Sequence, residues 1–262
     1  MAINHKAIKQ YKWVYMRKIC IALSKGGVAK STTAVSIAHG LALTGKKVLI
    51  IDTDDQAQIS FLLGVSPQHG LAEVLNGEVA IQDSLTQARK NLWLLAGGSG
   101  LSGVKRSIGK SEAGAEQTLV KALMPLEGQF DFILVDTSPA WDTLTISSLF
   151  YCTEVLAPVS LEILTLRGLI TFAERLKLVQ AYNKAIKLAY VLPTFADGRV
   201  KKSSEIMAQL KKHYAALVCE PVRYSVRLSE TAGLGKTIFE YAPSSAGAAD
   251  YRKLIKRIMN HG

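Results

Sequence analysis

A glycine-rich turn between an apolar run and a helical pattern is the feature that most constrains the fold of this chain. The run Arg17–Leu23 (RKICIAL) predicts a short buried strand, and Ser31–Leu43 has its apolar residues at helical spacing. The turn between them reads Ser24-Lys25-Gly26-Gly27-Val28-Ala29-Lys30. Such a strand–turn–helix unit directs backbone N–H groups and the positive end of a helix toward one point. The sequence therefore predicts an anion site, in which Lys30 would reach the β- and γ-phosphates of a nucleotide and the Ser31 hydroxyl would ligate Mg²⁺.

Two further apolar runs end in aspartate. Lys47–Ile51 (KVLII) ends at Asp52, with Asp54 two residues later, and Phe130–Val135 (FDFILV) ends at Asp136. In an open α/β sheet, ligands bind at the carboxyl ends of parallel strands. We therefore expect these carboxylates to lie at the same edge of the sheet as the predicted anion site.

The rest of the chain continues to alternate between strand-like and helix-like stretches. Continuous apolar strands separated by helices indicate a parallel sheet that is covered on both faces. The predicted fold class is α/β, with a doubly wound, mainly parallel central sheet and helices on both faces. The stretch Gly97–Gly114 is rich in glycine and serine and is expected to form a mobile loop. Further strands are predicted at Leu92–Leu95, Val155–Val159 and Ile186–Leu192, the last ending at Pro193, and further helices at Ile163–Tyr182, Lys201–His213 and Ala246–Met259.

Length and composition exclude several other classes of protein. The 262 residues suit one large domain, 16–262, preceded by a basic tail, 1–15. The 48% of hydrophobic and 20% of charged residues are typical of a globular protein rather than a disordered one. No apolar run reaches the roughly 18 residues of a membrane span, and the N-terminus lacks the apolar core of a secretory signal. The three cysteines, Cys20, Cys152 and Cys219, form no CxxC pair and are expected to be buried free thiols.

The positive charge is concentrated in the last third of the chain. The formal net charge is +11, yet residues 19–166 hold 10 bases against 14 acids, whereas residues 167–262 hold 17 bases against 7 acids. A localised basic surface suits a polyanion, either nucleic acid or an anionic membrane. The alternative is a set of solvated helix faces that keep the protein soluble.

The exact form of the glycine-rich turn carries a family resemblance. The pattern G-x-x-x-x-G-K-[ST] is not met, because Ser24 and Ala29 stand at its glycine positions, and the chain has K-G-G-x-x-K-[ST] instead. This form resembles the deviant Walker-A loop of the ParA/MinD group of P-loop NTPases. The segment after the second strand, Asp52-Thr53-Asp54-Asp55-Gln56, resembles the D-x-D-P-Q of that group, with Asp55 where proline would stiffen the segment.

The resemblance implies a role for each matching residue in ATP hydrolysis, with ATP and Mg²⁺ as cofactors. Lys25 would reach across a dimer to the partner's nucleotide, and Asp54 would orient the attacking water. Asp52 and Asp136 would hold the water shell of the metal, which Ser31 ligates. The catalytic residues are then Lys25, Lys30 and Asp54. The nucleotide-binding residues are Lys25, Gly26, Gly27, Val28, Ala29, Lys30, Ser31, Thr32 and Asp136, with Arg223 and Ser225 near the adenine.

The C-terminal block narrows the resemblance. Residues 226–251 (VRLSETAGLGKTIFEYAPSSAGAADY) are similar to the C-terminal block of small ParA/Soj proteins, and the resemblance covers about 16–262. It implies a cytoplasmic, nucleoid-associated ATPase that forms a homodimer with ATP and binds duplex DNA non-specifically. A ParB-like or McdB-like adaptor would stimulate its slow hydrolysis, and its cargo would be a plasmid, a chromosome region or a protein body such as the carboxysome. The candidate DNA-binding residues are Lys201, Lys202, Arg223, Arg227, Lys236, Lys253, Lys256 and Arg257.

Three other functions compete with this interpretation. A MinD-like ATPase would bind membrane through its last helix, where Tyr251, Leu254, Ile255, Ile258 and Met259 form one apolar face; the same pattern also fits a helix packed on the core. An electron-transfer ATPase like nitrogenase iron protein needs two cluster cysteines at the dimer axis, and Cys20 and Cys152 do not occupy such positions. A non-enzymatic scaffold would require loss of the loop or the aspartates, and both are present.

Overall fold

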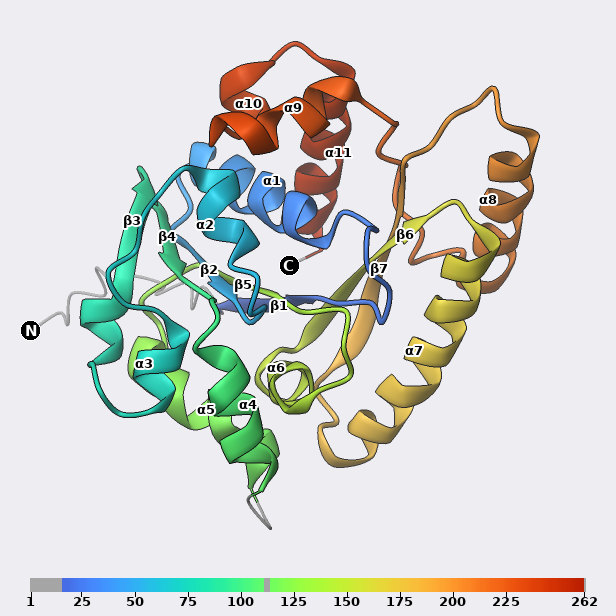
Figure 1. Cartoon of the computed structure of the whole chain (residues 1–262). Helices are drawn as coiled ribbons and strands as arrows, with labels where there is room; N and C mark the ends of the chain where they lie inside the picture. Colours follow the sequence, from blue (N-terminus) through green and yellow to red (C-terminus); the bar gives the residue numbers. More distant parts are fainter. Residues whose placement is uncertain (1–15, 111–113, 262) are drawn as a thin grey trace, which may run out of the picture.

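A seven-stranded sheet forms the centre of the molecule, and helices cover both of its faces (Figure 1). The computed structural model describes residues 16–110 and 114–261, so the predicted tail, 1–15, lies outside the described residues. The strands are β1 Arg17–Ile21, β2 Val48–Asp52, β3 Leu85–Arg89, β4 Leu92–Leu95, β5 Phe132–Asp136, β6 Glu154–Ser160 and β7 Lys187–Thr194. They lie in the order β3-β4-β2-β5-β1-β6-β7, and all neighbours are parallel except β3 and β4. The predicted fold class is confirmed.

The helices form one layer on each side of this sheet. They are α1 Lys30–Leu43, α2 Gln58–Leu63, α3 Leu71–Leu75, α4 Leu101–Gly109, α5 Thr118–Leu123, α6 Thr143–Tyr151, α7 Ile163–Tyr182, α8 Lys201–Tyr214, α9 Val226–Leu234, α10 Ile238–Tyr241 and α11 Ala246–Asn260, with short 3₁₀ turns at Ile81–Ser84, Ala115–Gln117 and Met124–Leu126. Helices α1, α2, α10 and α11 contribute to the apolar cluster on one face, and α3 to α8 contribute to the cluster on the other. All residues of β2 and β5 are buried, as parallel strands covered on both faces must be.

Two sequence-based expectations are wrong. The stretch expected to be a mobile loop, Gly97–Gly114, contains the helix α4, because Leu101 and Val104 are buried in the core while the residues between them stay polar. Residues 111–113 of that stretch lie outside the described residues. The last strand does not end before Pro193 but continues through it to Thr194 as β7, which is an edge strand where a missing N–H is tolerated. The antiparallel strand β3 is not predicted by the sequence.

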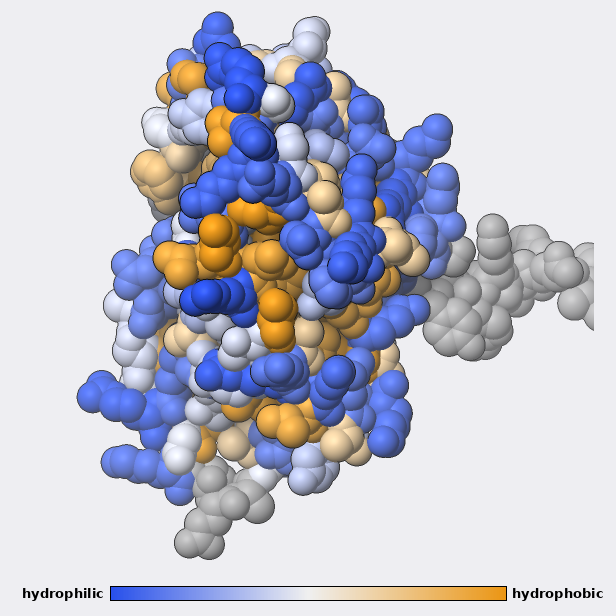
Figure 2. Space-filling model, turned by 90° about the vertical axis from the view of Figure 1, so that its right-hand side faces the viewer, coloured by the Kyte–Doolittle hydropathy of each residue, from blue (hydrophilic) through white to orange (hydrophobic). Residues whose placement is uncertain are grey.

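Cysteine burial agrees with the prediction, since all three cysteines are free and buried. None of the helices in the described ranges combines the length and the hydropathy needed to cross a lipid bilayer. Figure 2 views the side of the molecule that carries α7 and α8, and hydrophobic side chains gather in the middle of this face. The exposed large apolar residues of α7 are Ile163, Leu164, Ile170, Leu178 and Tyr182.

The apolar face of the last helix is part of the core. Tyr251, Leu254, Ile255 and Ile258 of α11 are at most 5% exposed. The Tyr251 hydroxyl lies 3.1 Å from Thr33 Oγ1 of α1 in a hydrogen bond. Helix α1 makes room for α11 at Gly40, where a Cβ atom would lie 2.1 Å from Ile255 Cδ1. The structure therefore favours the packed helix over the membrane-binding helix.

We expect Ile258→Ala to lower the free energy of unfolding by about 2–5 kcal/mol, because it opens a cavity at a fully buried position. Met259→Ala is the matched control, since Met259 is 39% exposed and its loss should change stability by no more than about 0.5 kcal/mol. Urea unfolding of the two variants measures the difference. Equal, small losses of stability would show that α11 is not packed on the core.

Candidate functional site

The glycine-rich loop joins β1 to α1 through two residues in left-handed backbone conformation. Gly27 has φ 71°, and Ala29, just before the first turn of α1, has φ 67°. Alanine disfavours this conformation, so the loop stores strain where the sequence departs from the glycine of the usual pattern. Thr194 at the end of β7 donates a hydrogen bond to the Val28 carbonyl oxygen at 3.2 Å, which fixes the loop to the sheet.

Lys30 is buried at the base of this loop, with only 7% of the residue exposed. Its Nζ donates a hydrogen bond to the Lys25 carbonyl oxygen at 2.9 Å. Burial lowers the pKa of Lys30, and the nearby carboxylates of Asp136 and Asp54 act in the opposite direction. The ammonium group is therefore held beside the loop, at the end of the sheet where the aspartates lie.

Two of the predicted aspartates lie side by side at the ends of adjacent strands. Asp52 of β2 is paired in register with Asp136 of β5, and both are buried. Asp52 accepts hydrogen bonds from the backbone N–H groups of Asp54, at 2.9 Å, and Ile59, at 3.2 Å. Burial raises the pKa of Asp52 to about 7. Burial also raises the pKa of Asp136 well above its usual value, and the charge of Asp52 adds to this effect.

The carboxylate of Asp136 fits a magnesium site. Both of its oxygens are buried and have no hydrogen-bond partner among the residues that the structure describes. The described residues contain no group of three or more His, Cys, Asp or Glu side chains that could hold a metal unaided. Mg²⁺ retains several waters and is bound by one or two carboxylates together with substrate phosphates, so it needs no such group. An unpartnered carboxylate beside Ser31 and Lys30 suits this kind of coordination.

A cavity of about 690 Å³ lies over the loop. Four of the residues predicted for the nucleotide site do not line the cavity: Val28, whose side chain is buried, and Lys25, Asp52 and Asp136. The predicted residues that do line it are Gly26, Gly27, Ala29, Lys30, Ser31, Thr32, Asp54, Arg223 and Ser225. The structure thus brings most of the predicted nucleotide-binding residues to one place, although Arg223 and Ser225 are about 190 residues away from the loop in sequence.

Arg223 reaches the cavity from the segment between α8 and α9, beside the end of β7. Its Nε and one terminal nitrogen donate to the two carboxylate oxygens of Asp250 at 2.9 and 2.8 Å. Asp250, at 4% side-chain exposure, is held within α11, so the Arg223 guanidinium is fixed at the cavity edge. Phe195 also lines the cavity, with φ 54° and 42% exposure.

Several polar residues that line the cavity are absent from the predicted site, among them Lys105 and Asp142. Lys105 of α4 lines the cavity, and its Nζ lies 2.8 Å from an oxygen of Asp142. Asp142 and Ser138 follow β5 and also line the cavity. The signal for Lys105 was hidden because its helix lies in a stretch expected to be a loop. Asp142 has a local signal, since it precedes a helix as an N-cap and accepts a hydrogen bond from Thr145 N at 2.8 Å.

The predicted DNA-binding residues fall into separate groups. Lys201 and Lys202 are exposed on α8, at the right-hand edge of Figure 1, whereas Lys253 and Lys256 are exposed on α11. Arg227 and Lys236 belong to α9 and the turn after it and are also exposed. Arg257 is different, because its guanidinium donates to the backbone carbonyls of Val218 and Ala216.

Comparison with known proteins agrees with the nucleotide site described above. The sequence pattern of the family described as AAA domain matches residues 16–188. The chain is 35% identical to the chromosome-partitioning ATPase Soj of Thermus thermophilus over 246 residues, covering 93% of this chain and 96% of the relative. It is 29% identical to the chromosome partitioning protein ParA of Caulobacter vibrioides, covering 94% of each chain.

Solved structures share the fold. Cobyrinic acid a,c-diamide synthase from Mycobacterium smegmatis, solved with ADP and magnesium, superposes with a TM-score of 0.82 at 30% identity over 94% of this chain and 95% of that chain. McdA from Cyanothece gives a TM-score of 0.82 at 24% identity over 94% and 100% of the two chains, which shows the fold alone.

The neighbour from Mycobacterium smegmatis has been solved both with ADP and with an ATP analogue, each together with magnesium. The cofactors of the present site are accordingly ATP and Mg²⁺, as the sequence predicted. The deviant loop at Lys25–Ser31, the aspartate-tipped parallel strands, the matched AAA domain and the Soj relative together establish that this chain belongs to the ParA/MinD group of P-loop ATPases.

Proposed function

We propose that this ParA-type ATPase is a nucleotide-controlled switch that binds DNA as an ATP-bound dimer and positions or segregates a cargo. A partner-stimulated, otherwise slow hydrolysis of ATP would release it from DNA. The observation that carries the proposal is the joining of Lys30, Ser31 and Asp54 in one cavity, beside the unpartnered carboxylate of Asp136.

Each residue at the phosphate end has a role that its geometry supports. The backbone of the loop would surround the β-phosphate, and Lys30, freed from the Lys25 carbonyl, would neutralise the phosphates. Mg²⁺ would be held by the Ser31 hydroxyl and, through water, by Asp136. Asp52 contributes mainly by fixing the loop that carries Asp54, since both of its oxygens already accept backbone hydrogen bonds. Asp54 is only half-buried and lines the cavity, as a residue that orients a water must.

The position of Lys25 supports a dimer. Lys25 does not line the cavity of its own chain and is partly exposed beside the start of α7, where a Cβ at Gly168 would lie 4.0 Å from Lys25 Cβ. Ile163 and Leu164 begin α7 and are 48% and 63% exposed. A second chain placed against this surface would cover the apolar residues and would receive Lys25 at its own nucleotide.

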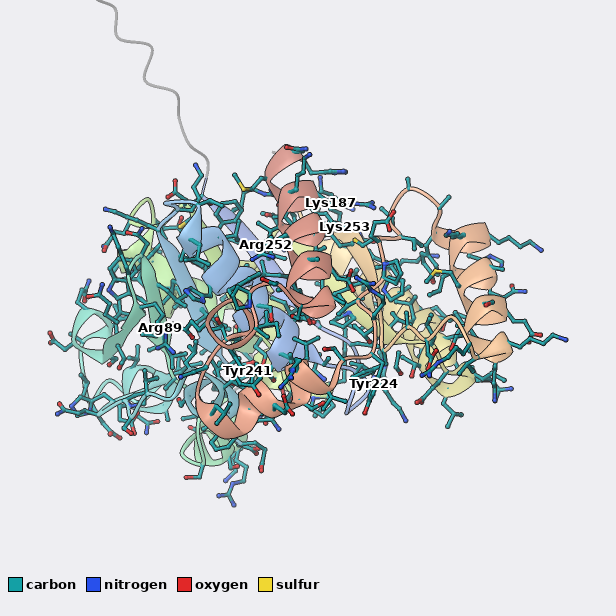
Figure 3. The ribbon with its side chains drawn as sticks, turned by 90° about the horizontal axis from the view of Figure 1, so that it is seen from above. Arg89, Lys187, Tyr224, Tyr241, Arg252 and Lys253 are labelled. Carbon is teal, nitrogen blue, oxygen red and sulfur yellow. The ribbon has the colours of Figure 1, made fainter. Side chains whose placement is uncertain are left out.

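Exposed basic side chains offer a surface for DNA. Figure 3 looks onto α11 from above, with Arg252 and Lys253 on the helix and Lys187 of β7 close by in the view. These three residues are exposed, and Arg252 is braced by the Phe239 ring, 5.4 Å away. Arg252 and Lys187 extend the predicted set. Contacts of this type are made to phosphates and give affinity without sequence preference.

The cargo is proposed from the relatives. Soj and ParA are described as chromosome-partitioning proteins, which favours a DNA cargo, with a ParB-like adaptor, over a protein body with an McdB-like one. We expect the protein on the nucleoid in the cytoplasm. The MinD-like alternative is disfavoured because the apolar face of α11 is buried against α1.

Lys30→Ala should weaken ATP binding by roughly 30-fold or more, since it leaves the phosphates without a buried cation. Lys47→Ala removes an exposed lysine outside the cavity and serves as the matched control. Equilibrium binding of a fluorescent ATP analogue measures both. Near-normal affinity in Lys30→Ala would contradict the assignment of the loop.

Asp54→Ala should accumulate an ATP-bound dimer, because the nucleotide binds while the attacking water is no longer oriented. Adding Lys25→Ala to this variant should return the protein to monomer. Size-exclusion chromatography with light scattering in the presence of ATP reads the mass directly. The control Asp83→Ala, an exposed aspartate, should behave as the unaltered protein does. A dimer that survives without Lys25 would rule out its role in trans.

Two double variants should each weaken binding of a random-sequence duplex in the presence of ATP: Lys253→Ala/Lys256→Ala and Lys201→Ala/Lys202→Ala. For every phosphate that the protein no longer neutralises, the slope of log affinity against log salt should become shallower by about 0.9. Lys110→Ala/Lys121→Ala removes the same charge from the C-cap of α4 and from α5 and should leave the slope unchanged. An equal loss of affinity in this control would mean that net charge alone drives binding. Anionic vesicles in place of DNA test the MinD-like alternative in the same assay.

A further inference from the structure

Helix α4 touches both loops that carry the chemistry of the site. The first is the loop Asp54–Ala57, after β2, and the second is Ser138–Asp142, after β5. Residues Ser102 and Lys105 stand three positions apart on α4 and so project from the same side of the helix. Ser102 reaches the first loop and Lys105 reaches the second.

The contact with the first loop restrains a segment that has Asp55 where the resembling family has a stiffening proline. Ser102 Oγ donates a hydrogen bond to Asp55 Oδ2 at 3.0 Å, and the Gln56 amide donates to Asp55 Oδ1 at 3.0 Å. The segment leading into α4 also packs closely on this loop. Gly98 N donates to the Asp54 carbonyl oxygen at 3.1 Å. A Cβ at Gly97 would lie 2.4 Å from the same oxygen, so only glycine allows the approach.

The contact with the second loop is an ion pair that is largely shielded from solvent. Lys105 Nζ lies 2.8 Å from Asp142 Oδ2, and the two side chains are 15% and 21% exposed. Asp142 in turn caps α6 through Thr145 N and accepts a hydrogen bond from Ser138 Oγ at 3.3 Å. The Lys105 ammonium thereby anchors the loop that begins directly after Asp136.

Lys105 is also part of the cavity wall. It lines the cavity together with Asp54, Ser138 and Asp142. The hydrogen bonds from Gln56 and Ser102 lower the pKa of Asp55, and the charge of Lys105 acts in the same direction. A cation that sits between the two loops and beside the water-orienting aspartate can set their separation around the γ-phosphate.

We propose that Lys105 is a positioning residue for ATP hydrolysis, which holds the Asp54 loop and the Ser138–Asp142 loop in their reactive arrangement through α4. This inference rests on the proposed function of the cavity. The ammonium acts through Asp142, and Ser102 acts through Asp55. ADP would bring no γ-phosphate to these loops, so we expect its binding not to depend on Lys105.

The test is Lys105→Met, which keeps the length of the side chain and removes its charge. We expect the single-turnover rate of hydrolysis of bound ATP to fall about tenfold, as small misplacements of reacting groups do. The dissociation constant of ADP should stay within about twofold of its original value. Lys105→Arg should restore most of the rate. Lys110→Met, the same change at the exposed C-cap of the same helix, is the matched control.

A double-mutant cycle with Asp142→Asn separates positioning from direct action. The asparagine oxygen can still cap α6 but no longer pairs with a full charge. In that background, Lys105→Met should cost at most about twofold in rate, because the pair is already broken. An undiminished tenfold loss would overturn the proposal, since Lys105 would then act on the nucleotide itself. An unchanged rate in Lys105→Met alone would overturn it as well.

The two proposals fail in different ways. If the unaltered protein binds ATP but Lys105→Met hydrolyses it at the normal rate, only the role of Lys105 is lost. If the unaltered protein neither binds nor hydrolyses ATP, the proposed function of the cavity is lost first. Thermal unfolding of Lys105→Met completes the set, because a lower rate that merely follows a lower melting temperature, with ADP affinity reduced in parallel, would indicate a structural role and overturn the proposal.

Discussion

The parallel pairing of β1, β2 and β5 is the constraint on which the rest of the structure depends. Ile21 at the end of β1 and Asp52 at the end of β2 are both in register with Asp136 at the end of β5. The three strands therefore end level, between two buried apolar layers that prevent a slip along the strand direction. The phosphate loop and both carboxylates meet at one edge because the strands that carry them cannot end anywhere else.

Burial of these charged side chains is unfavourable to the stability of the fold. Two carboxylates lie next to each other away from water, and burial raises the pKa of both. Desolvation favours the neutral form of both carboxyls, and a bound cation would favour their charged form. The Lys30 ammonium is also buried, and it donates a hydrogen bond to a backbone carbonyl oxygen of its own loop. Phosphates and Mg²⁺ would bring opposite charges to these side chains, which favours their binding at this edge of the sheet.

The sequence predicts those parts of the site that depend on local pattern. Sequence pattern predicts the apolar strands that end in Asp52 and Asp136 and the glycine-rich turn before Lys30. Each is a continuous segment whose conformation is largely determined by its own residues. Helix α4 cannot be predicted from its own residues in this way. It has glycine and serine where helix formers would be expected, and it forms because Leu101 and Val104 pack into the core. The distribution of charge likewise indicates that the last third of the chain is basic, but it does not indicate which of these side chains share a surface. Arg257, for example, binds backbone carbonyls instead of facing solvent.

Asp55 and α4 are best understood together. Where the resembling family has a proline, a fixed φ angle restrains the loop covalently and without any further contact. Asp55 has no such restraint, and the chain compensates by bringing Ser102 to its carboxylate and Gly98 to the neighbouring backbone. Restraint by contact differs from restraint by proline in one respect, since it depends on the position of α4. If Lys105 has the role proposed for it, this loop is joined to Asp142 through Ser102, α4 and Lys105, so a change at either loop would reach the other.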